Sequence, residues 1–137
     1  MAQRKQGVIK NLQINQCINY EFTFRGKTLE ELFGIGEYNH YSFKIKSWIR
    51  IEMYRLVQEI VDNHINSTYF SRNILNQKNV HVLISMLVSI AKHGFSKRIR
   101  HDFEMHWNAN CLDAYGNSRF MHYVKDQFTK FDNLINS

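Results

Sequence analysis

The sequence predicts a mainly α-helical protein with a small N-terminal β element. Three segments, near 46–65, 80–93 and 118–135, carry apolar residues at helical spacing, and each forms a single stripe of the kind that a helix buries. The segment 7–25 instead alternates between apolar and polar residues, which favours extended strands. At 137 residues, the chain is expected to form one domain or a domain with an appendage.

The N-terminal β element is expected to be a hairpin. Residues that share one face of an extended segment are Ile18, Tyr20, Phe22 and Phe24. Residues that suggest a partner strand are Val8, Leu12 and Ile14. Alternation of this kind is typical of a half-buried strand pair.

A short helix is predicted in "TLEELFGIG". Thr28 and Glu31 have the spacing of a capping box, which opens a helix. Gly34 and Gly36 then stop it sharply. Because no Cβ intrudes, the same glycine turn would also let the backbone approach a phosphate closely.

Longer helices come next. A helix near 46–65 is predicted by the stripe Ile49, Met53, Leu56 and Ile60. After it, "NHINST" is expected to be a polar loop. A second helix is predicted by the stripe Leu83, Met86, Leu87 and Ile90. Gly94 stands where a left-handed C-cap is needed, and Ser96 can cap the segment after it. A last helix is predicted by Phe120, Val124, Phe128, Phe131 and Ile135.

The charge balance indicates an acidic macromolecule as partner. The net charge is +6 and the isoelectric point is near 9.4, which suits a phosphate-rich surface. A basic surface without a specific partner is the alternative. Cys17 and Cys111 form no CxxC pair, so neither a disulfide framework nor a cysteine zinc site is expected.

Targeting signals are weak. No apolar run reaches the ~20 residues that a membrane span needs. The N-terminal "MAQRKQGVIKNLQ" lacks the apolar core of a secretory signal. It fits either a mitochondrial presequence or an amphipathic arm.

Residue usage matches the codon bias of an AT-rich genome. The chain holds 10 Phe, 7 Tyr and 5 Met against 6 Gly and no Pro, and Ile, Asn and Lys are abundant. The abundant residues have AT-rich codons, so the preference for Lys over Arg reflects mutational pressure rather than chemistry. We expect a very AT-rich source, such as an organelle genome.

Seven histidines raise the question of a metal site. His101 and His106 are five residues apart, which on a helix places them about 140° from each other. No set of carboxylates and histidines has ligand spacing, and the sequence holds neither a P-loop nor a GxGxxG motif. We therefore expect no metal and no cofactor.

The basic segment "GFSKRIRH" favours a nucleic-acid contact. Lys97, Arg98 and Arg100 are expected to project together from the tight turn after Gly94. Amides at the next helix start would add a phosphate site, and each cation at a phosphate releases counterions. A solvated charge run at a helix end is the alternative without function.

Two other functions stay open. Arg100 and His106 resemble the Arg-to-His motif of HEPN-type ribonucleases, in which both residues act at the RNA phosphate. A small DNA-binding regulator with a helix-turn-helix at residues 80–107 is the other alternative.

Two segments together resemble the universal small-subunit ribosomal protein thirteen family. The first, "TLEELFGIG", resembles the family's "ALTxIYGIG". Leu29 stands for its Leu, Leu32 for its Ile, and Gly34-Ile35-Gly36 matches outright.

The second segment lies further along the chain, in the order that the family has. "LVSIAKHGFSKRIRH" resembles the family's "IxRLxxIGCYRGLRH". Gly94 fits the first glycine, Lys97 the Arg, and Arg100-His101 the Arg-His pair. Arg98 stands where the family has its second glycine.

The resemblance covers residues 25–101 and implies a structural protein of the small-subunit head, with a helix-two-turns-helix domain and no enzymatic activity. The implied partners are small-subunit rRNA, head protein nineteen and, across the subunit bridge, large-subunit protein five, with the P-site tRNA as a further possible contact. With the AT-rich composition, it implies a mitochondrial ribosome and an organelle-encoded chain. The implied rRNA-binding residues are Gly34, Gly36, Gly94, Lys97, Arg98, Arg100 and His101.

The C-terminal part departs from the family. We expect residues 1–102 to form the ribosomal-protein-like domain and residues 103–137 a divergent helical extension. The family continues with a tail rich in Arg and Gly, whereas residues 102–137 hold three cations against five anions. Such a charge balance does not suit a tail that runs along phosphates. The aromatic stripe of this extension must be buried either against the domain's own helices or against a neighbouring protein, and we favour the neighbouring protein because a domain this small has limited core to offer.

Overall fold

The computed structural model describes residues 22–39, 42–67, 77–111 and 119–137. These residues are mainly helical and include a small antiparallel strand pair near the N-terminal end, which confirms the predicted fold class. The elements in chain order are β1 (Thr23–Phe24), β2 (Lys27–Thr28), α1 (Leu29–Phe33), the 3₁₀ turn η1 (Gly36–Tyr38), α2 (Ser47–Ser67), α3 (Gln77–His93), α4 (Lys97–His106), the π-helical turn η2 (Trp107–Cys111) and α5 (Arg119–Asn136).

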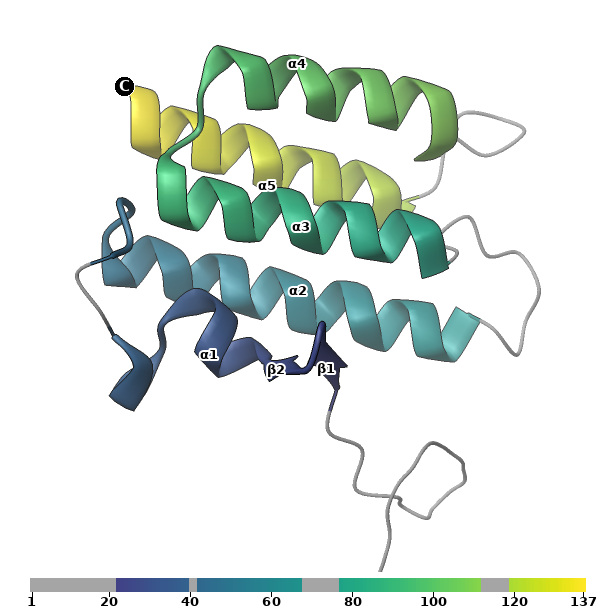
Figure 1. The fold of residues 1–137 in the computed structure, drawn as a ribbon. Helices are drawn as coiled ribbons and strands as arrows, with labels where there is room; N and C mark the ends of the chain where they lie inside the picture. The colour runs from purple at the N-terminus through teal and green to yellow at the C-terminus, as the bar shows by residue number, and fades with distance from the viewer. Residues whose placement is uncertain (1–21, 40–41, 68–76, 112–118) are drawn as a thin grey trace, which may run out of the picture.

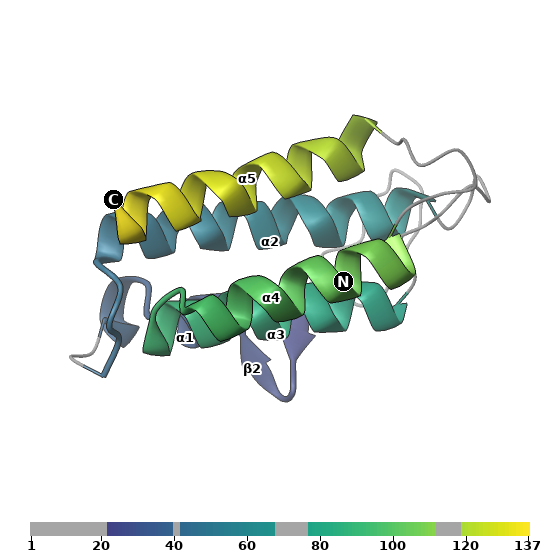
Figure 2. The same ribbon diagram turned by 90° about the horizontal axis from the view of Figure 1, so that it is seen from above.

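The long helices run in alternating directions along the chain (Figures 1 and 2). α5 packs along α2 and α4 packs along α3, while α1 and the strand pair lie against α2 and α3. One end of the bundle therefore collects the start of α2, the end of α3, the start of α4 and the end of α5. That end carries the candidate site.

The described strand pair overlaps the predicted β segment, residues 7–25, only in β1. β1 pairs with β2, the next strand in the chain, through a turn at Arg25 and Gly26. Both turn residues have positive φ, 54° and 78°, as a two-residue hairpin turn requires. Phe24 is buried and Phe22 partly buried, as the predicted strand face implies. The rest of the predicted hairpin lies within residues 1–21, outside the described part of the chain.

The predicted short helix is confirmed as α1. The Thr28 hydroxyl accepts a hydrogen bond from the N–H of Glu31 at 3.3 Å. Gly34 closes the helix in the left-handed conformation, with its N–H donating to the carbonyl of Glu30. The hydroxyl of Tyr54 donates to the Glu30 carboxylate at 2.5 Å, which fixes α1 on α2.

The predicted stripe of α2 is buried, but the helix is longer than expected. α2 runs to Ser67, so the loop predicted at "NHINST" is wrong for residues 63–67. The segment has polar side chains but neither Gly nor Pro, and polarity alone does not end a helix.

The stripes of α3 and α5 are also confirmed. Leu83, Leu87 and Ile90 are fully buried and Met86 is partly buried. The most buried residues of α5 are Met121, Val124, Phe128 and Phe131.

The aromatic stripe of α5 is covered by the protein's own helices, so the expectation of a neighbouring protein over it is wrong. The ring of Phe128 stacks on that of Phe103 with 4.2 Å between centroids, and Phe103 also contacts Trp107. α4 runs through residues 102 and 103, where we predicted a domain boundary.

Candidate nucleic-acid interface

Gly94 ends α3 and forms the turn into α4. Its φ is +94°, a conformation that favours glycine, and its N–H donates to the carbonyl of Ile90 at 2.8 Å. Ser96 then caps α4, because its Oγ accepts from the N–H of Ile99 at 3.2 Å. Both the predicted glycine stop and the predicted serine cap are confirmed.

Three of the predicted rRNA-binding side chains project from the start of α4. Lys97 and Arg98 lie in its first turn, and His101 lies one turn later; all three are exposed. Residues three and four apart are neighbours on a helix surface. These side chains therefore form one solvent-facing group at the helix start, where the first N–H groups, those of Lys97 and Arg98, have no carbonyl partner within the helix.

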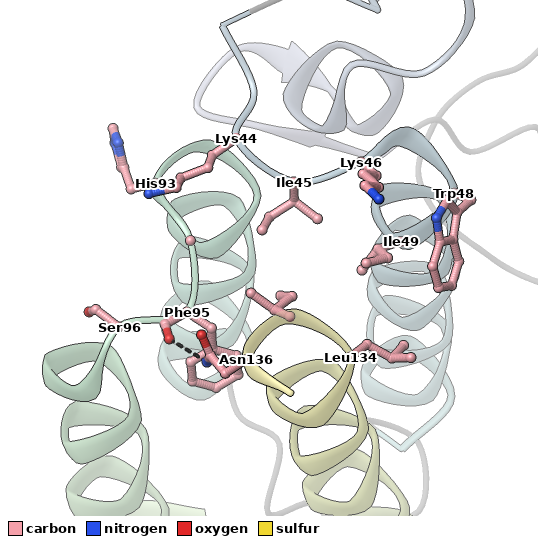
Figure 3. Close-up of a pocket in the computed structure, with 12 residues that line it drawn as sticks. Lys44, Ile45, Lys46, Trp48, Ile49, His93, Phe95, Ser96, Leu134 and Asn136 are labelled. Atoms are coloured by element: carbon pink, nitrogen blue, oxygen red, sulfur yellow. Dashed lines mark hydrogen bonds between the residues drawn. The ribbon is translucent and has the colours of Figure 1, made fainter.

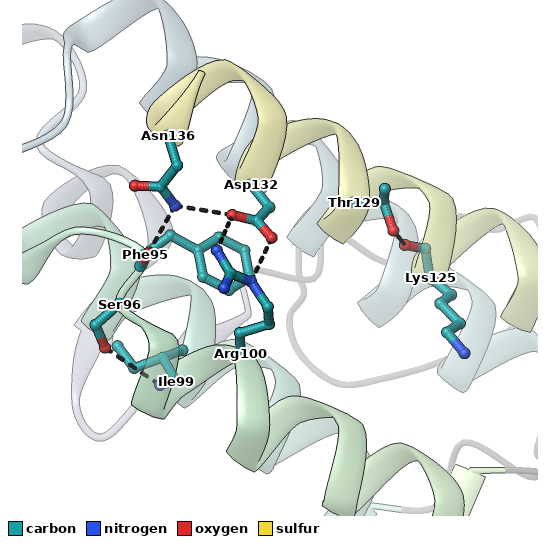
Figure 4. A network of polar contacts seen from close by, with 8 residues as sticks. All are labelled: Phe95, Ser96, Ile99, Arg100, Lys125, Thr129, Asp132 and Asn136. Carbon is teal, nitrogen blue, oxygen red and sulfur yellow. Dashed lines mark hydrogen bonds and ion pairs between the residues drawn. The ribbon is translucent and has the colours of Figure 1, made fainter.

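Arg100 is instead engaged within the protein (Figure 4). Its Nε and Nη2 donate to the two carboxylate oxygens of Asp132 at 2.6 and 2.8 Å. These bonds raise the pKa of Arg100 and lower that of Asp132. The side-chain amide of Asn136 donates to the same carboxylate and to the carbonyl of Phe95, both at 2.8 Å. Arg100 thus joins α4 to α5.

The two glycines of the predicted glycine turn have different surroundings. Both have φ of +64°. Gly34 is buried, and a Cβ there would lie 2.5 Å from atoms of Arg50 and of Phe43. Gly36 is exposed, with open space where a Cβ would point. Of the two, only Gly36 is open to solvent.

Sequence reasoning missed Lys44, which lies beside the Gly94 turn, and Lys46, which lies across the opening at the start of α2 (Figure 3). Both are exposed, whereas Ile45 between them is buried and its N–H donates to the carbonyl of Ala91 at 3.2 Å. That bond places the segment against the end of α3. Alternation of Lys, Ile and Lys just before a helix was the available signal, since an extended segment turns alternate side chains outward.

Four cations therefore gather where α2 and α4 begin. We call Lys44, Lys46, Lys97 and Arg98 the basic end of the bundle. Cations close together favour phosphate-rich partners, and the start of a helix adds partial positive charge.

Arg100 and His106 do not converge. Six residues apart on a helix, they point about 120° away from each other. Arg100 faces Asp132, whereas Nδ1 of the half-buried His106 lies 3.3 Å from the side-chain amide of Asn110. Burial, and to a lesser extent the charge of Lys78, lowers the pKa of His106, so its imidazole is neutral near pH 7. Its Nε2 is buried without a hydrogen-bond partner among the described residues.

Other kinds of site find little support in the described ranges. They contain no group of three or more His, Cys, Asp and Glu side chains that could hold a metal ion. Burial raises the pKa of the Cys111 thiol to about 11, which keeps it protonated and unreactive at neutral pH. None of the helices described combines the length and the apolar character needed to cross a bilayer.

Comparisons with known proteins give no match: no family model, no curated protein and no solved structure is significantly similar to this chain.

Proposed function

We propose that this protein is a structural constituent of the small ribosomal subunit that binds rRNA through the basic end. The observation that carries the proposal is the exposure of Lys97 and Arg98 in the first turn of a serine-capped helix. Side-chain cations and helix-start amides at one place match a phosphate backbone. The sequence resemblance to ribosomal protein thirteen supplies the kind of nucleic acid.

Within this proposal the predicted residues take different roles. Lys97, Arg98 and His101 contact phosphates, and Gly36 approaches one with its backbone. Gly94 shapes the turn.

Gly34 and Arg100 act inside the protein in this proposal. Gly34 makes room for Arg50, and Arg100 holds α5 through Asp132.

The proposed setting comes from the resemblance. The chain would occupy the head of a mitochondrial small subunit, with α3 and α4 in a helix-two-turns-helix domain. It would lie beside protein nineteen, bridge to large-subunit protein five and approach the P-site tRNA. No reaction is part of this role, and no residue is proposed as catalytic.

The two alternatives have less support. A helix-turn-helix regulator would lay α4 along a DNA groove, but Asp102 and Glu104 are exposed on that helix and would repel phosphates. A HEPN-type ribonuclease needs Arg100 and His106 at one phosphate, and Arg100 is paired with Asp132.

The test compares two double variants that remove the same charge. Lys97→Ala with Arg98→Ala should weaken binding to a structured small-subunit rRNA fragment. It should also reduce the slope of log K against log salt by about 1.5 units, because two phosphate contacts are lost. Lys125→Ala with Lys130→Ala on α5 is the control and should leave the slope nearly unchanged. Filter binding across a salt series measures both.

Equal slopes for the two double variants would exclude the start of α4 from the interface. A tagged copy of the full chain, expressed in its source cells, should also sediment with the small ribosomal subunit in a lysate of their mitochondria. Sedimentation only as a free protein would contradict the ribosomal role.

A further inference from the structure

A pocket of about 450 Å³ opens at the basic end of the bundle (Figure 3). Its walls are the start of α2, the turn between α3 and α4, and the end of α5. Pockets of this size are typical of sites for small molecules. Ile45 and Ile49 provide the apolar surface inside the pocket.

One wall of the pocket presents an exposed aromatic ring. The side chain of Trp48 is 54% exposed, and the neighbouring Leu134 is 39% exposed. In Figure 3 the two lie on the same side of the opening. By contrast, Trp107 is 2% exposed in the core. A free indole face beside a pocket is available for a planar ligand to stack on.

The rim of the pocket is positively charged. Lys44 and Lys46 line it, and no Asp or Glu is among the described residues that form the pocket wall. Lys97 and Arg98 come directly after the lining residue Ser96. An anionic ligand would therefore be attracted from the rim and from the adjoining helix start.

We propose that this pocket holds one unpaired RNA nucleotide, with its base against Trp48 and its phosphates at Lys44 and Lys46. A ring that stacks a base beside cations that hold the backbone is the usual means of binding single-stranded nucleic acid. The nucleotide must be unpaired, because a base inside a duplex cannot reach the indole. The inference rests on the proposed function and names the part of the RNA that this end of the bundle takes.

The experiment uses the full chain and a short oligouridylate. Stacking on Trp48 should quench the tryptophan fluorescence of the wild-type protein, while buried Trp107 contributes a constant background. Trp48→Leu should abolish the quenching and weaken binding at least about fivefold, as measured by anisotropy of a labelled oligouridylate. Trp48→Phe keeps a ring and should keep most of the affinity.

Met105→Ala is the matched control. Met105 is 59% exposed on α4 and does not line the pocket, so its removal should leave both signals unchanged. Circular dichroism should show native helix content in every variant, because neither replaced side chain is buried.

The outcomes separate this inference from the proposed function. If the variant of Lys97 and Arg98 loses rRNA binding but Trp48→Leu binds oligouridylate like wild type, the pocket assignment is wrong and the ribosomal role stands. If the wild-type chain binds no RNA, both fail. If Trp48→Leu keeps its RNA affinity but no longer joins the small subunit, the pocket takes a protein segment and the nucleotide assignment is overturned.

Discussion

Arg50 is a buried cation that fixes the turn after α1. Its guanidinium donates to the carbonyls of Phe33, Gly34 and Ile45 at 2.8, 2.6 and 2.8 Å, and to the side chain of Asn39 at 2.7 Å. Burial lowers the pKa of Arg50, but these acceptors replace the lost water. The glycine turn that was expected to meet a phosphate is thus held from inside the protein.

Gly34 and Gly36 allow a matched test of this packing, because both have φ of +64°. Gly36→Ala should cost about 1 kcal/mol, the strain of a side chain in the left-handed region. Gly34→Ala should cost about 1–3 kcal/mol more, because its Cβ would overlap Arg50 and Phe43. Urea unfolding of the two variants and the wild type measures both losses. Equal losses would mean that Arg50 and Phe43 move aside freely.

At the scale of elements, local patterns predicted the helices and their ends. Thr28 and Ser96 cap α1 and α4 as predicted, since a cap needs only a hydroxyl and an amide a few residues apart. The loop predicted at residues 63–67 is wrong because no stop signal accompanies its polar residues. The pairing of Arg100 with Asp132 joins residues 32 apart in sequence, and no local pattern specifies such a partner.

The sequence predicted only part of the candidate site, because local patterns do not specify contacts between distant segments. The turn after Gly94 and the cations just beyond it are local features of the sequence. Lys44 and Lys46 join them only because α2 and α4 begin at the same end of the bundle. Exposure of Trp48 is likewise a result of packing: its apolar character alone favours the core.

The ion pair between α4 and α5 predicts an acid-sensitive junction. Hydrogen bonds from Arg100, and then from Asn136, lower the pKa of Asp132 below its ordinary 3.8. The pKa of Asp132 is therefore lower in the folded state than in the unfolded state. The ion pair stabilises the fold fully at a pH above the pKa of the unfolded state, and this stabilisation is lost as the pH falls through the pKa of the folded state. Asp132→Asn should therefore lower the melting temperature at pH 7, and its gap to wild type should narrow below about pH 4.

Thermal melts of wild type and Asp132→Asn across this pH range provide the measurement. Asp126→Asn, an exposed position on the same helix, is the control and should melt like wild type throughout. A gap between wild type and Asp132→Asn that stays constant down to pH 3 would show that the ion pair adds nothing to the junction.

At the scale of the whole molecule, α5 belongs to the same core as the helices before it. Phe128 and Phe131 are fully buried, together with Trp107 of η2. Side chains of α5 reach the other helices as well: the Tyr123 hydroxyl donates to the Glu59 carboxylate of α2 at 2.6 Å. Without residues 103–137, α2 and α3 would leave a large apolar surface open to water.

We therefore expect the chain to unfold as one cooperative unit. Phe128→Ala removes a ring that is 1% exposed and stacked on Phe103, and should lower the free energy of unfolding by about 3–5 kcal/mol. Leu134→Ala on the same helix should cost less than about 1 kcal/mol, because Leu134 is 39% exposed.

Urea unfolding measured by circular dichroism reports all helices, and fluorescence reports Trp48 on α2 and Trp107 on η2. Both signals should shift together in Phe128→Ala, since a core shared by α2, α4 and α5 cannot be lost from one helix alone. Two separate transitions would instead mean that the C-terminal helix is an independent extension.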